Sequence, residues 1–207
     1  MNRSNILRFS MIASHHATRA DARRNRRRLL DAAIEIVLEV GGDPPLDAVA
    51  KRAGVGIGTL YRHFPDRQQL LAGVAHDVID RAIEAGETAL REASGGGEAV
   101  RRYMHAAIDN GLGAVNIVHP LIADPDWPDR RVAAKAMLDR LLRAAHDDAA
   151  IGKDVTTNEI ALATIRFCRP LAVGISLAEE RAIAHHQLDR YLDGLAAGER
   201  SAASQIG

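Results

Sequence analysis

The sequence is poor in cysteine and in aromatic residues. Cys168 is the single cysteine among 207 residues, so no disulfide can form within the chain and we expect a reducing, cytoplasmic setting. Aromatic residues make up 3% of the chain while Ala and Leu are abundant, which favours helices over sheets. No apolar run approaches the roughly 20 residues of a membrane span, and Arg8 interrupts an apolar start too short for a signal peptide.

Motifs that carry catalysis are also missing from the sequence. There is no GxSxG, no phosphate-binding loop and no dinucleotide fingerprint, so we predict no enzyme and no catalytic residue. His105 and Asp109 are four residues apart and could share one face of a helix, but no further ligand stands at a supporting spacing. We therefore predict no metal site and no cofactor.

The chain has no net charge, but its basic and acidic residues are unevenly distributed along the sequence. The chain has 27 basic and 27 acidic residues. Residues 1–67 hold 12 Lys/Arg and 7 Asp/Glu, a net charge of +5, and the remaining 15 basic and 20 acidic residues give −5. A basic front on an acidic body is the pattern of a domain that faces nucleic acid, attached to one that faces away from it.

Residues 46–64, LDAVAKRAGVGIGTLYRHF, predict two short helices joined by a tight turn. In the first helix Val49, Ala50 and Ala53 share one apolar face. Gly54 supplies the left-handed backbone that ends this helix. The second helix begins near Gly56 and ends at Phe64, because Pro65 follows.

The second of these helices has one apolar face and one polar face. Helical spacing places Ile57, Leu60 and Phe64 inward. The outer side then carries small and polar residues only, which suit the groove of a DNA duplex: Gly58, Thr59 and Arg62, with Tyr61 and His63 on the flanks. The alternative is an ordinary helical hairpin with a polar outer face, which periodicity alone does not exclude.

The pattern AxxAGVxxGTLYRHFPxRxxLL resembles the DNA-binding segment of the Tet repressor (TetR) family of bacterial transcription regulators, without a gap from about residue 26 to 74. The resemblance implies an all-α fold, in which an N-terminal three-helix helix-turn-helix domain is joined by a long helix to a helical ligand-binding and dimerisation domain. It also implies a homodimeric repressor that binds a palindromic operator through the major groove and is released by a small-molecule effector. The residues expected to contact DNA are Arg23, Arg24, Gly56, Gly58, Thr59, Tyr61, Arg62, His63 and Arg67.

We expect four regions along the chain: a disordered extension over residues 1–20, the helix-turn-helix domain over 21–67, the regulatory and dimerisation domain over 68–198, and a loose tail over 199–207. Gly41-Gly42 ends the first helix of the DNA-binding domain, and Asp66 caps the long helix that follows it. The long helix reaches the flexible break 94–97. Further helices are expected over about 98–118, 128–146, 154–177 with a kink at Pro170, and 180–195.

The resemblance places a ligand pocket in the second domain, with a dimer interface on its last two helices. The candidate pocket residues are Met104, Ile108, Leu112, Val115, Trp127, Met137 and Phe167, and ordinary core packing is the alternative for each of them. Val132, Met137 and Leu138 are expected to face inward from the helix over 128–146. The candidate interface residues are Ala161, Thr164, Phe167, Cys168, Leu188, Tyr191, Leu192 and Leu195. Arg166 and Arg169 could recognise an acidic ligand or pair with acids across the dimer.

Two positions depart from the family pattern. Pro45 and Gly56 stand where the resemblance would place a Ser or Thr that caps a helix and contacts a phosphate. The alternative function is therefore a helical small-molecule sensor or interaction protein that has lost specific DNA binding.

Overall fold

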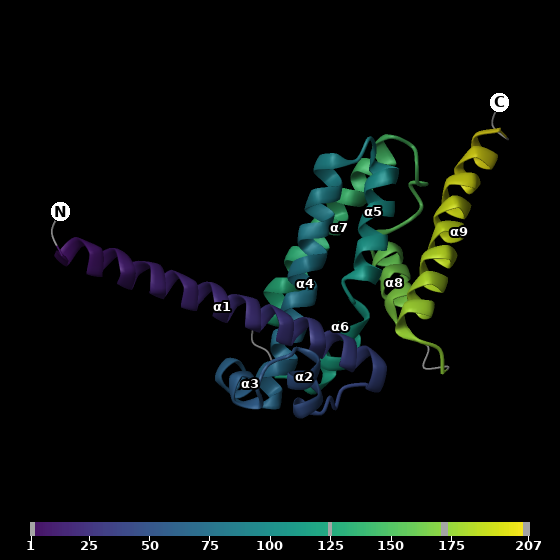
Figure 1. Cartoon of the computed structure of the whole chain (residues 1–207). Coiled ribbons are helices and arrows are strands. Elements are labelled where there is room, and N and C mark those ends of the chain that lie inside the picture. The colour runs from purple at the N-terminus through teal and green to yellow at the C-terminus, as the bar shows by residue number, and fades with distance from the viewer. Residues whose placement is uncertain (1–2, 124–125, 171–173, 205–207) are drawn as a thin grey trace.

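The computed structural model describes residues 3–123, 126–170 and 174–204 (Figure 1). This part of the chain forms nine α-helices and one short 3-10 helix, and it contains no strand. None of its helices is long and apolar enough to cross a membrane. The elements are α1 (Arg3–Val40), α2 (Leu46–Arg52), α3 (Ile57–His63), α4 (Arg67–Glu92), α5 (Gly96–Asp109), α6 (Gly113–Val118), η1 (His119–Leu121), α7 (Trp127–Asp147), α8 (Thr157–Cys168) and α9 (Leu177–Ser204).

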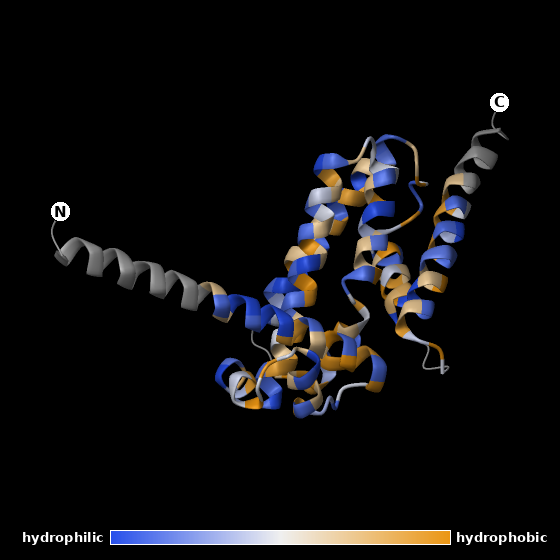
Figure 2. Cartoon of the chain, in the orientation of Figure 1, coloured by the Kyte–Doolittle hydropathy of each residue, from blue (hydrophilic) through white to orange (hydrophobic). Residues whose placement is uncertain are grey.

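Helix α1 is much longer than expected and extends away from the rest of the molecule at its N-terminal end (Figure 1). Its residues 3–20 are helical, so the prediction of a disordered extension is wrong for them. The first 40 residues contain neither Gly nor Pro, so nothing interrupts a helix once it has formed. From Leu29 on, α1 joins the core and its inward residues are buried. Figure 2 shows the described part of α1 changing from mainly blue to a mixture of blue and orange where it reaches the other helices. Gly41, with φ 94°, ends the helix as predicted.

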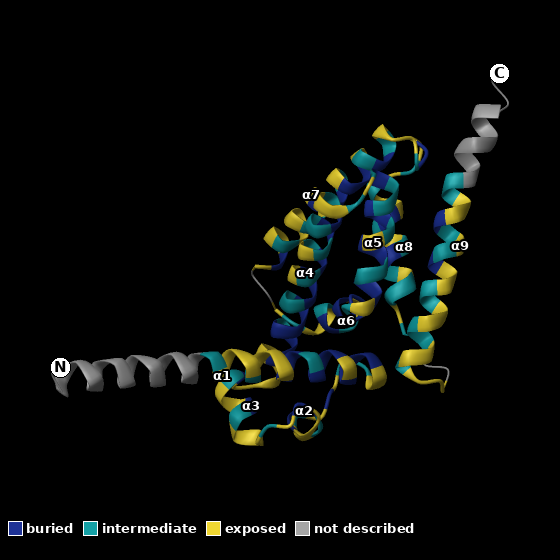
Figure 3. Ribbon diagram, turned by 45° about the horizontal axis from the view of Figure 1, so that its top comes forward, coloured by how far each residue is buried: buried dark blue, intermediate teal, exposed yellow. Residues whose placement is uncertain are grey.

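Helices α2 and α3 form the predicted pair. Val49, Ala50 and Ala53 are buried, and Gly54 has φ 64°, the left-handed conformation expected at the end of α2. Leu60 and Phe64 are fully buried, and α3 packs against α2 and α1. The contacts among α1, α2 and α3 form a small core, and the opposite side of α3 faces the solvent (Figure 3).

Helix α4 connects this small core to the C-terminal helices. Its cap is Asp66, whose carboxylate accepts a hydrogen bond from the Gln69 backbone N–H at 2.8 Å. The predicted stripe over this helix is confirmed, because Leu70, Leu71, Val74, Val78 and Ala82 are all buried. Helix α4 packs against α1 at one end and against α5, α6 and α7 along its length, so one rigid element spans both domains.

Glycines at both ends of α5 differ from their predicted roles, and two predictions are corrected here: the flexible break over 94–97 and the single helix over 98–118. Gly96 and Gly97 belong to α5, so the flexible break is shorter than expected. A Cβ on Gly96 would come closer than 3.0 Å to the backbone of Ala144 and Ala145, so this glycine allows α5 to touch α7. The single helix expected over 98–118 is divided into α5 and α6 because Gly111 has φ 73° and ends α5.

The last helices also differ from their predicted bounds. Helix α8 ends at Cys168, so Pro170 follows a helix end and does not kink a continuous helix. Helix α9 continues to Ser204, so residues 199–204 are helical where a loose tail was expected, and residues 1–2 and 205–207 lie outside the described part. Val132 of α7 is 68% exposed, whereas Met137 and Leu138 are buried as predicted.

An ion-pair cluster fixes α1 to α4 where the two domains meet. The guanidinium group of Arg81 contacts the carboxylate of Asp31 on α1 at 2.5 Å, and also that of Asp77 on its own helix. Arg27 of α1 lies 3.3 Å from Asp31 and 3.8 Å from Asp77. Arg81 and Asp77 are largely buried, so this cluster is less screened by solvent than a surface pair.

Candidate nucleic-acid interface and ligand cavity

The exposed side of α3 carries small and polar residues around two glycines, together with the apolar Ile57. A Cβ on Gly56 or on Gly58 would meet nothing within 4 Å, so the backbone here is open to close approach. Tyr61 and Arg62 are exposed, while Thr59 and His63 are partly exposed. The predicted residues of α3 therefore lie on one accessible surface, which offers hydroxyl, guanidinium, phenol and imidazole groups to a partner.

The inward placement of Ile57 is wrong. Its side chain is 43% exposed, although Leu60 and Phe64, with which it shares helical spacing, are 0% and 1% exposed. Ile57 is the first residue of α3 and follows Gly56, whose backbone is extended. At a helix end the neighbouring turn that would cover such a side chain is absent, so periodicity alone misplaces it.

Three of the N-terminal arginines hold the domain together. The guanidinium group of Arg26 lies over the Phe64 ring, 4.5 Å from its centroid. Arg28 donates a hydrogen bond to the Gly54 carbonyl at 3.4 Å. Arg27 belongs to the ion-pair cluster between α1 and α4. The crowding of positive charge at this end of the domain is therefore partly balanced within the protein.

The predicted phosphate-contacting arginines are exposed. Arg24 is paired with Asp21, and Arg67 with Asp43. Arg62 donates from Nε to the Gly58 carbonyl at 3.2 Å, which positions its guanidinium group along α3. Exposed ion pairs contribute about 0–1 kcal/mol, so a phosphate can displace the carboxylate at little cost.

Helices α2 and α3 lack the side-chain caps that a Ser or Thr would provide, as expected from the sequence. Pro45 and Gly56 are the N-cap residues, and neither makes a side-chain hydrogen bond to its helix. The backbone N–H groups at the start of α3 are therefore not capped by a hydroxyl, and they remain able to donate to an anion.

His63 lies beside two arginines. Partial burial, together with the positive charges of Arg26 and Arg62, lowers the pKa of His63 below its usual value. The imidazole is therefore neutral at pH 7 in the free protein and can both donate and accept a hydrogen bond.

A cavity of about 690 Å³ lies among α4, α5, α6, α7 and α8. Its walls include Ile79, Leu112, Val115, Trp127 and Leu138, which are buried apolar residues. The polar groups that reach it come from residues that sequence reasoning did not assign to a pocket: Tyr103, Asn116, His119, Arg131, Lys135, Thr157, Asn158 and Thr164. None of its lining residues is acidic. A cavity of this size and composition fits a small, mainly apolar molecule.

The predicted pocket residues divide into three groups. Leu112, Val115 and Trp127 line the large cavity, and the Trp127 ring lies 4.4 Å from that of His119. Met104 and Met137 are buried and line neither this cavity nor the smaller one described below, so for them core packing is the better description. Nothing in the sequence marks the other lining residues, because they come from separate helices and meet only when α4, α5, α6, α7 and α8 pack together.

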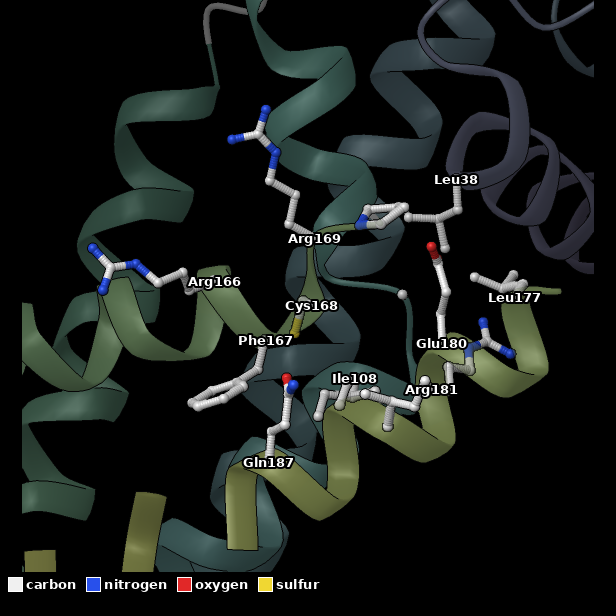
Figure 4. Close-up of a pocket in the computed structure, with 14 residues that line it drawn as sticks. Leu38, Ile108, Arg166, Phe167, Cys168, Arg169, Leu177, Glu180, Arg181 and Gln187 are labelled. Atoms are coloured by element: carbon white, nitrogen blue, oxygen red, sulfur yellow. The ribbon is translucent and has the colours of Figure 1, made fainter. Parts of the chain in front are cut away.

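Ile108 and Phe167 line a second, smaller cavity of about 60 Å³ where α1, α5, α8 and α9 meet (Figure 4). Arg166 and Arg169 are at its edge, with their guanidinium groups turned away from Glu180 and Gln187. This orientation gives no support to the idea that these two arginines recognise an acidic ligand inside the cavity.

The large cavity is connected to the DNA-binding domain through α6 and η1. Asn116 and His119 line the cavity from these elements. On the other side, the Leu121 carbonyl accepts a hydrogen bond from Gln68 of α4 at 3.0 Å. Leu121 and Ile117 also lie against Gly42, which follows α1. A molecule that moves α6 would therefore move the start of α4.

The expected dimer residues are only partly accessible. Thr164, Leu188 and Leu192 are buried within the protomer, so these three offer no surface to a partner and their placement in the interface is wrong. Phe167 and Tyr191 are partly exposed and contact each other, with ring centroids 5.5 Å apart. Ala161 and Leu195 are also partly exposed. The same helices carry apolar residues that were not predicted, with Leu162 61% and Ile183 44% exposed.

His105 and Asp109 take part in contacts between α5 and α9. The Nδ1 atoms of His105 and His185 are 2.6 Å apart, His105 Nε2 lies 3.0 Å from Asp189, and His185 Nε2 lies 2.9 Å from Asp109. In the part of the chain that the structure describes, no group of three or more His, Cys, Asp or Glu residues is arranged to hold a metal ion. These four side chains join α5 to α9 by hydrogen bonds.

Comparisons with known proteins agree with this architecture. The family model described as bacterial regulatory proteins, tetR family, matches residues 29–74. A TetR transcriptional regulator from Streptomyces coelicolor is 30% identical, with a TM-score of 0.63 over 82% of this chain and 97% of that one. A TetR transcription regulatory protein from Mycobacterium vanbaalenii is 33% identical, with a TM-score of 0.61 over 86% and 98% of the two chains.

Curated relatives match over shorter segments. The HTH-type transcriptional repressor LfrR from Mycolicibacterium smegmatis is 33% identical over 105 residues, which is 50% of this chain and 55% of LfrR. The first curated relatives are matched over only 30% of their own length. The two solved structures, however, are matched over nearly their whole length and share both domains with this protein. The chain therefore belongs to the TetR family of transcriptional regulators.

Proposed function

We propose that this chain is a ligand-responsive transcriptional repressor that acts in the cytoplasm and does not catalyse a reaction. It binds a palindromic DNA operator as a homodimer, and a small-molecule effector in the large cavity releases it. Thr59, Tyr61, Arg62 and His63 contact the bases and their flanking phosphates, with the backbone at Gly56 and Gly58 close to the groove. Arg23, Arg24 and Arg67 contact phosphates.

The observation that carries this proposal is the surface of α3. A helix whose buried face fixes it on α2 and α1, and whose other face exposes mainly small and polar residues, is the form in which a helix-turn-helix domain enters a major groove. One helix of seven residues offers few contacts. Two copies related by a twofold axis double those contacts on a palindrome.

DNA binding is tested by selection from random-sequence duplexes with the purified full-length protein, followed by fluorescence anisotropy on the selected site. We expect the selected palindrome to bind at least 10³-fold more tightly than random DNA at the same salt concentration, and both affinities to fall as salt rises. Arg62→Ala should weaken the specific complex by about tenfold or more. Arg140→Ala is the matched control, because Arg140 is exposed on α7 and pairs with Glu87.

The effector site is tested with Trp127, the single tryptophan, which lines the cavity. The apolar anion 1-anilinonaphthalene-8-sulfonate is a suitable first probe, because the lining is apolar with basic residues and no acidic ones. We expect the probe to quench Trp127 fluorescence. Val115→Trp should place a bulky ring in the cavity and weaken probe binding, as followed by the probe's own fluorescence, while operator affinity is kept. Probe binding unchanged in this variant would contradict the assignment of the cavity.

The dimer is tested by sedimentation of the full-length protein. We expect a dimer that dissociates in the double variant Leu162→Glu, Ile183→Glu, because these exposed apolar side chains lie on α8 and α9. Val132→Glu is the control, because Val132 is also an exposed apolar residue, at 68%, but lies on α7. A monomeric wild type would contradict the proposal.

The second candidate is a helical small-molecule sensor that has lost specific DNA binding. The observation in its favour is that the N-caps of α2 and α3, Pro45 and Gly56, provide no hydroxyl. This candidate is supported if the selection yields no preferred sequence while the probe still binds the cavity.

A further inference from the structure

Ile57 is an exposed apolar residue at the N-terminal end of the surface proposed to contact DNA. Its side chain is 43% exposed at the first position of α3, and Tyr61, one turn further along, is 48% exposed. Leu60 and Phe64, which anchor the same helix, are buried. The side chain of Ile57 is therefore not needed to hold α3 in place.

The backbone around Ile57 is unusually open. It stands between Gly56 and Gly58, and a Cβ on either glycine would meet nothing within 4 Å. Because both of its neighbours are glycines, Ile57 is the one residue with a side chain among residues 56–58. Neither neighbour has a side chain that would separate Ile57 from a partner at the start of α3.

The chemistry of isoleucine restricts what it can read. The side chain has no hydrogen-bond donor or acceptor, so it cannot pair with base edges or with phosphates. The one apolar group that the major groove displays on an unmodified base pair is the C5-methyl of thymine. In helix-turn-helix proteins the N-terminal residues of the second helix contact the base edges.

We propose that Ile57 packs against the C5-methyl group of a thymine in each operator half-site, and that it thereby determines the base preference at that position. This inference rests on the proposed function, because it requires α3 to enter a major groove. It goes further by naming the operator group that is recognised, and it assigns specificity to a residue that sequence periodicity places in the core.

The experiment replaces operator thymines by deoxyuridine, which removes only the methyl group and keeps base pairing. The operator comes from the random-sequence selection, and symmetric thymine pairs are replaced one pair at a time. Affinities are measured by fluorescence anisotropy with the full-length protein. We expect one symmetric pair at which deoxyuridine weakens the wild-type complex by about four- to fifteenfold, from the loss of one buried methyl contact in each half-site.

Variants of Ile57 assign the methyl contact to this side chain. Ile57→Ala should bind the thymine operator more weakly and respond to the same replacement by less than twofold. Ile57→Val keeps a branched apolar side chain and should keep most of the response. Arg23→Ala is the matched control: Arg23 is exposed on α1, so its loss lowers affinity without altering the ratio between thymine and deoxyuridine operators.

Three results would overturn the inference. The first is an operator with no thymine shared by its half-sites, and the second is a wild-type protein indifferent to deoxyuridine at every pair. The third is Ile57→Ala with the wild-type response, which would assign the methyl contact to another residue. In all three cases the protein still selects an operator, so the proposed function stands. If no sequence is selected at all, the proposed function fails and this inference fails with it.

Discussion

Replacing Gly96 by alanine sets two physical effects against each other. Gly96 is in the first turn of α5, where alanine has the higher helix propensity and should stabilise the fold by at most about 1 kcal/mol. The added Cβ, however, would come closer than 3.0 Å to backbone atoms of Ala144 and Ala145 in α7. Carbon atoms pack at about 3.5–4.0 Å, so the two helices must separate by at least about 0.5 Å.

The separation of α5 from α7 has a second cost. The backbone N–H of Gly96 donates to the Asp148 carboxylate at 2.5 Å, and this bond links the end of α7 to the start of α5. Overpacking costs about 1–3 kcal/mol, and a weakened hydrogen bond to a charged group costs about 1 kcal/mol more. The net expectation for Gly96→Ala is a loss of about 2 kcal/mol in the free energy of unfolding.

The measurement is urea and thermal unfolding of the full-length protein at fixed protomer concentration, since an oligomer's stability depends on concentration. A loss of 2 kcal/mol corresponds to about 4–8 °C in Tm for a chain of this size. Gly194→Ala in α9 is the matched control, because a Cβ there meets nothing within 4 Å and only the propensity gain remains. If Gly96→Ala is as stable as Gly194→Ala, the helices are not in the contact described.

Three further predictions follow from other contacts. Gly58→Ala should leave the unfolding free energy unchanged or slightly raised, because a Cβ there meets open space, but it should weaken operator binding measured by anisotropy, since the close approach of α3 is lost. Arg81→Met should lower the free energy of unfolding by about 3 kcal/mol, because it leaves the largely buried Asp77 beside Asp31 without its main partner; Arg91→Met, at an exposed position on the same helix, should have little effect in the same urea titration. Burial, and to a lesser degree the charge of Asp109, raise the pKa of Cys168 to about 12, so at pH 8 the native thiol is protonated and should react with a disulfide reagent orders of magnitude more slowly than the urea-unfolded chain; equal rates would contradict its burial.

Local signals were sufficient for the helix ends and caps around the helix-turn-helix pair. Gly41 and Gly54 end their helices with positive φ, and Asp66 caps α4, as their residue types and positions predicted. The apolar stripe of α4 is buried as its spacing required. The caps and helix ends depend on residues only a few positions apart, and for α4 the helical period alone shows which side of the helix is apolar.

Predictions that depended on distant partners were less successful. Gly96 and Gly97 look like a flexible linker in sequence, but Gly96 is a contact point because α7 lies against it. Val132 and Ile57 satisfy a helical apolar stripe but are exposed, since no neighbouring element covers them. The residues of the large cavity could be identified in sequence only where they are apolar, because its polar lining comes from helices whose packing the sequence does not reveal.

The sequence by itself determined that this protein is all-helical, that it contains a helix-turn-helix segment, and to which family it belongs, because these follow from short-range backbone preferences and a contiguous motif. Only the tertiary structure decided which arginines are available to DNA, where the cavity lies and how it reaches α4, and that Ile57 faces outward. Such properties depend on which surfaces the helices cover when they pack, and that is fixed by contacts between residues far apart in the chain.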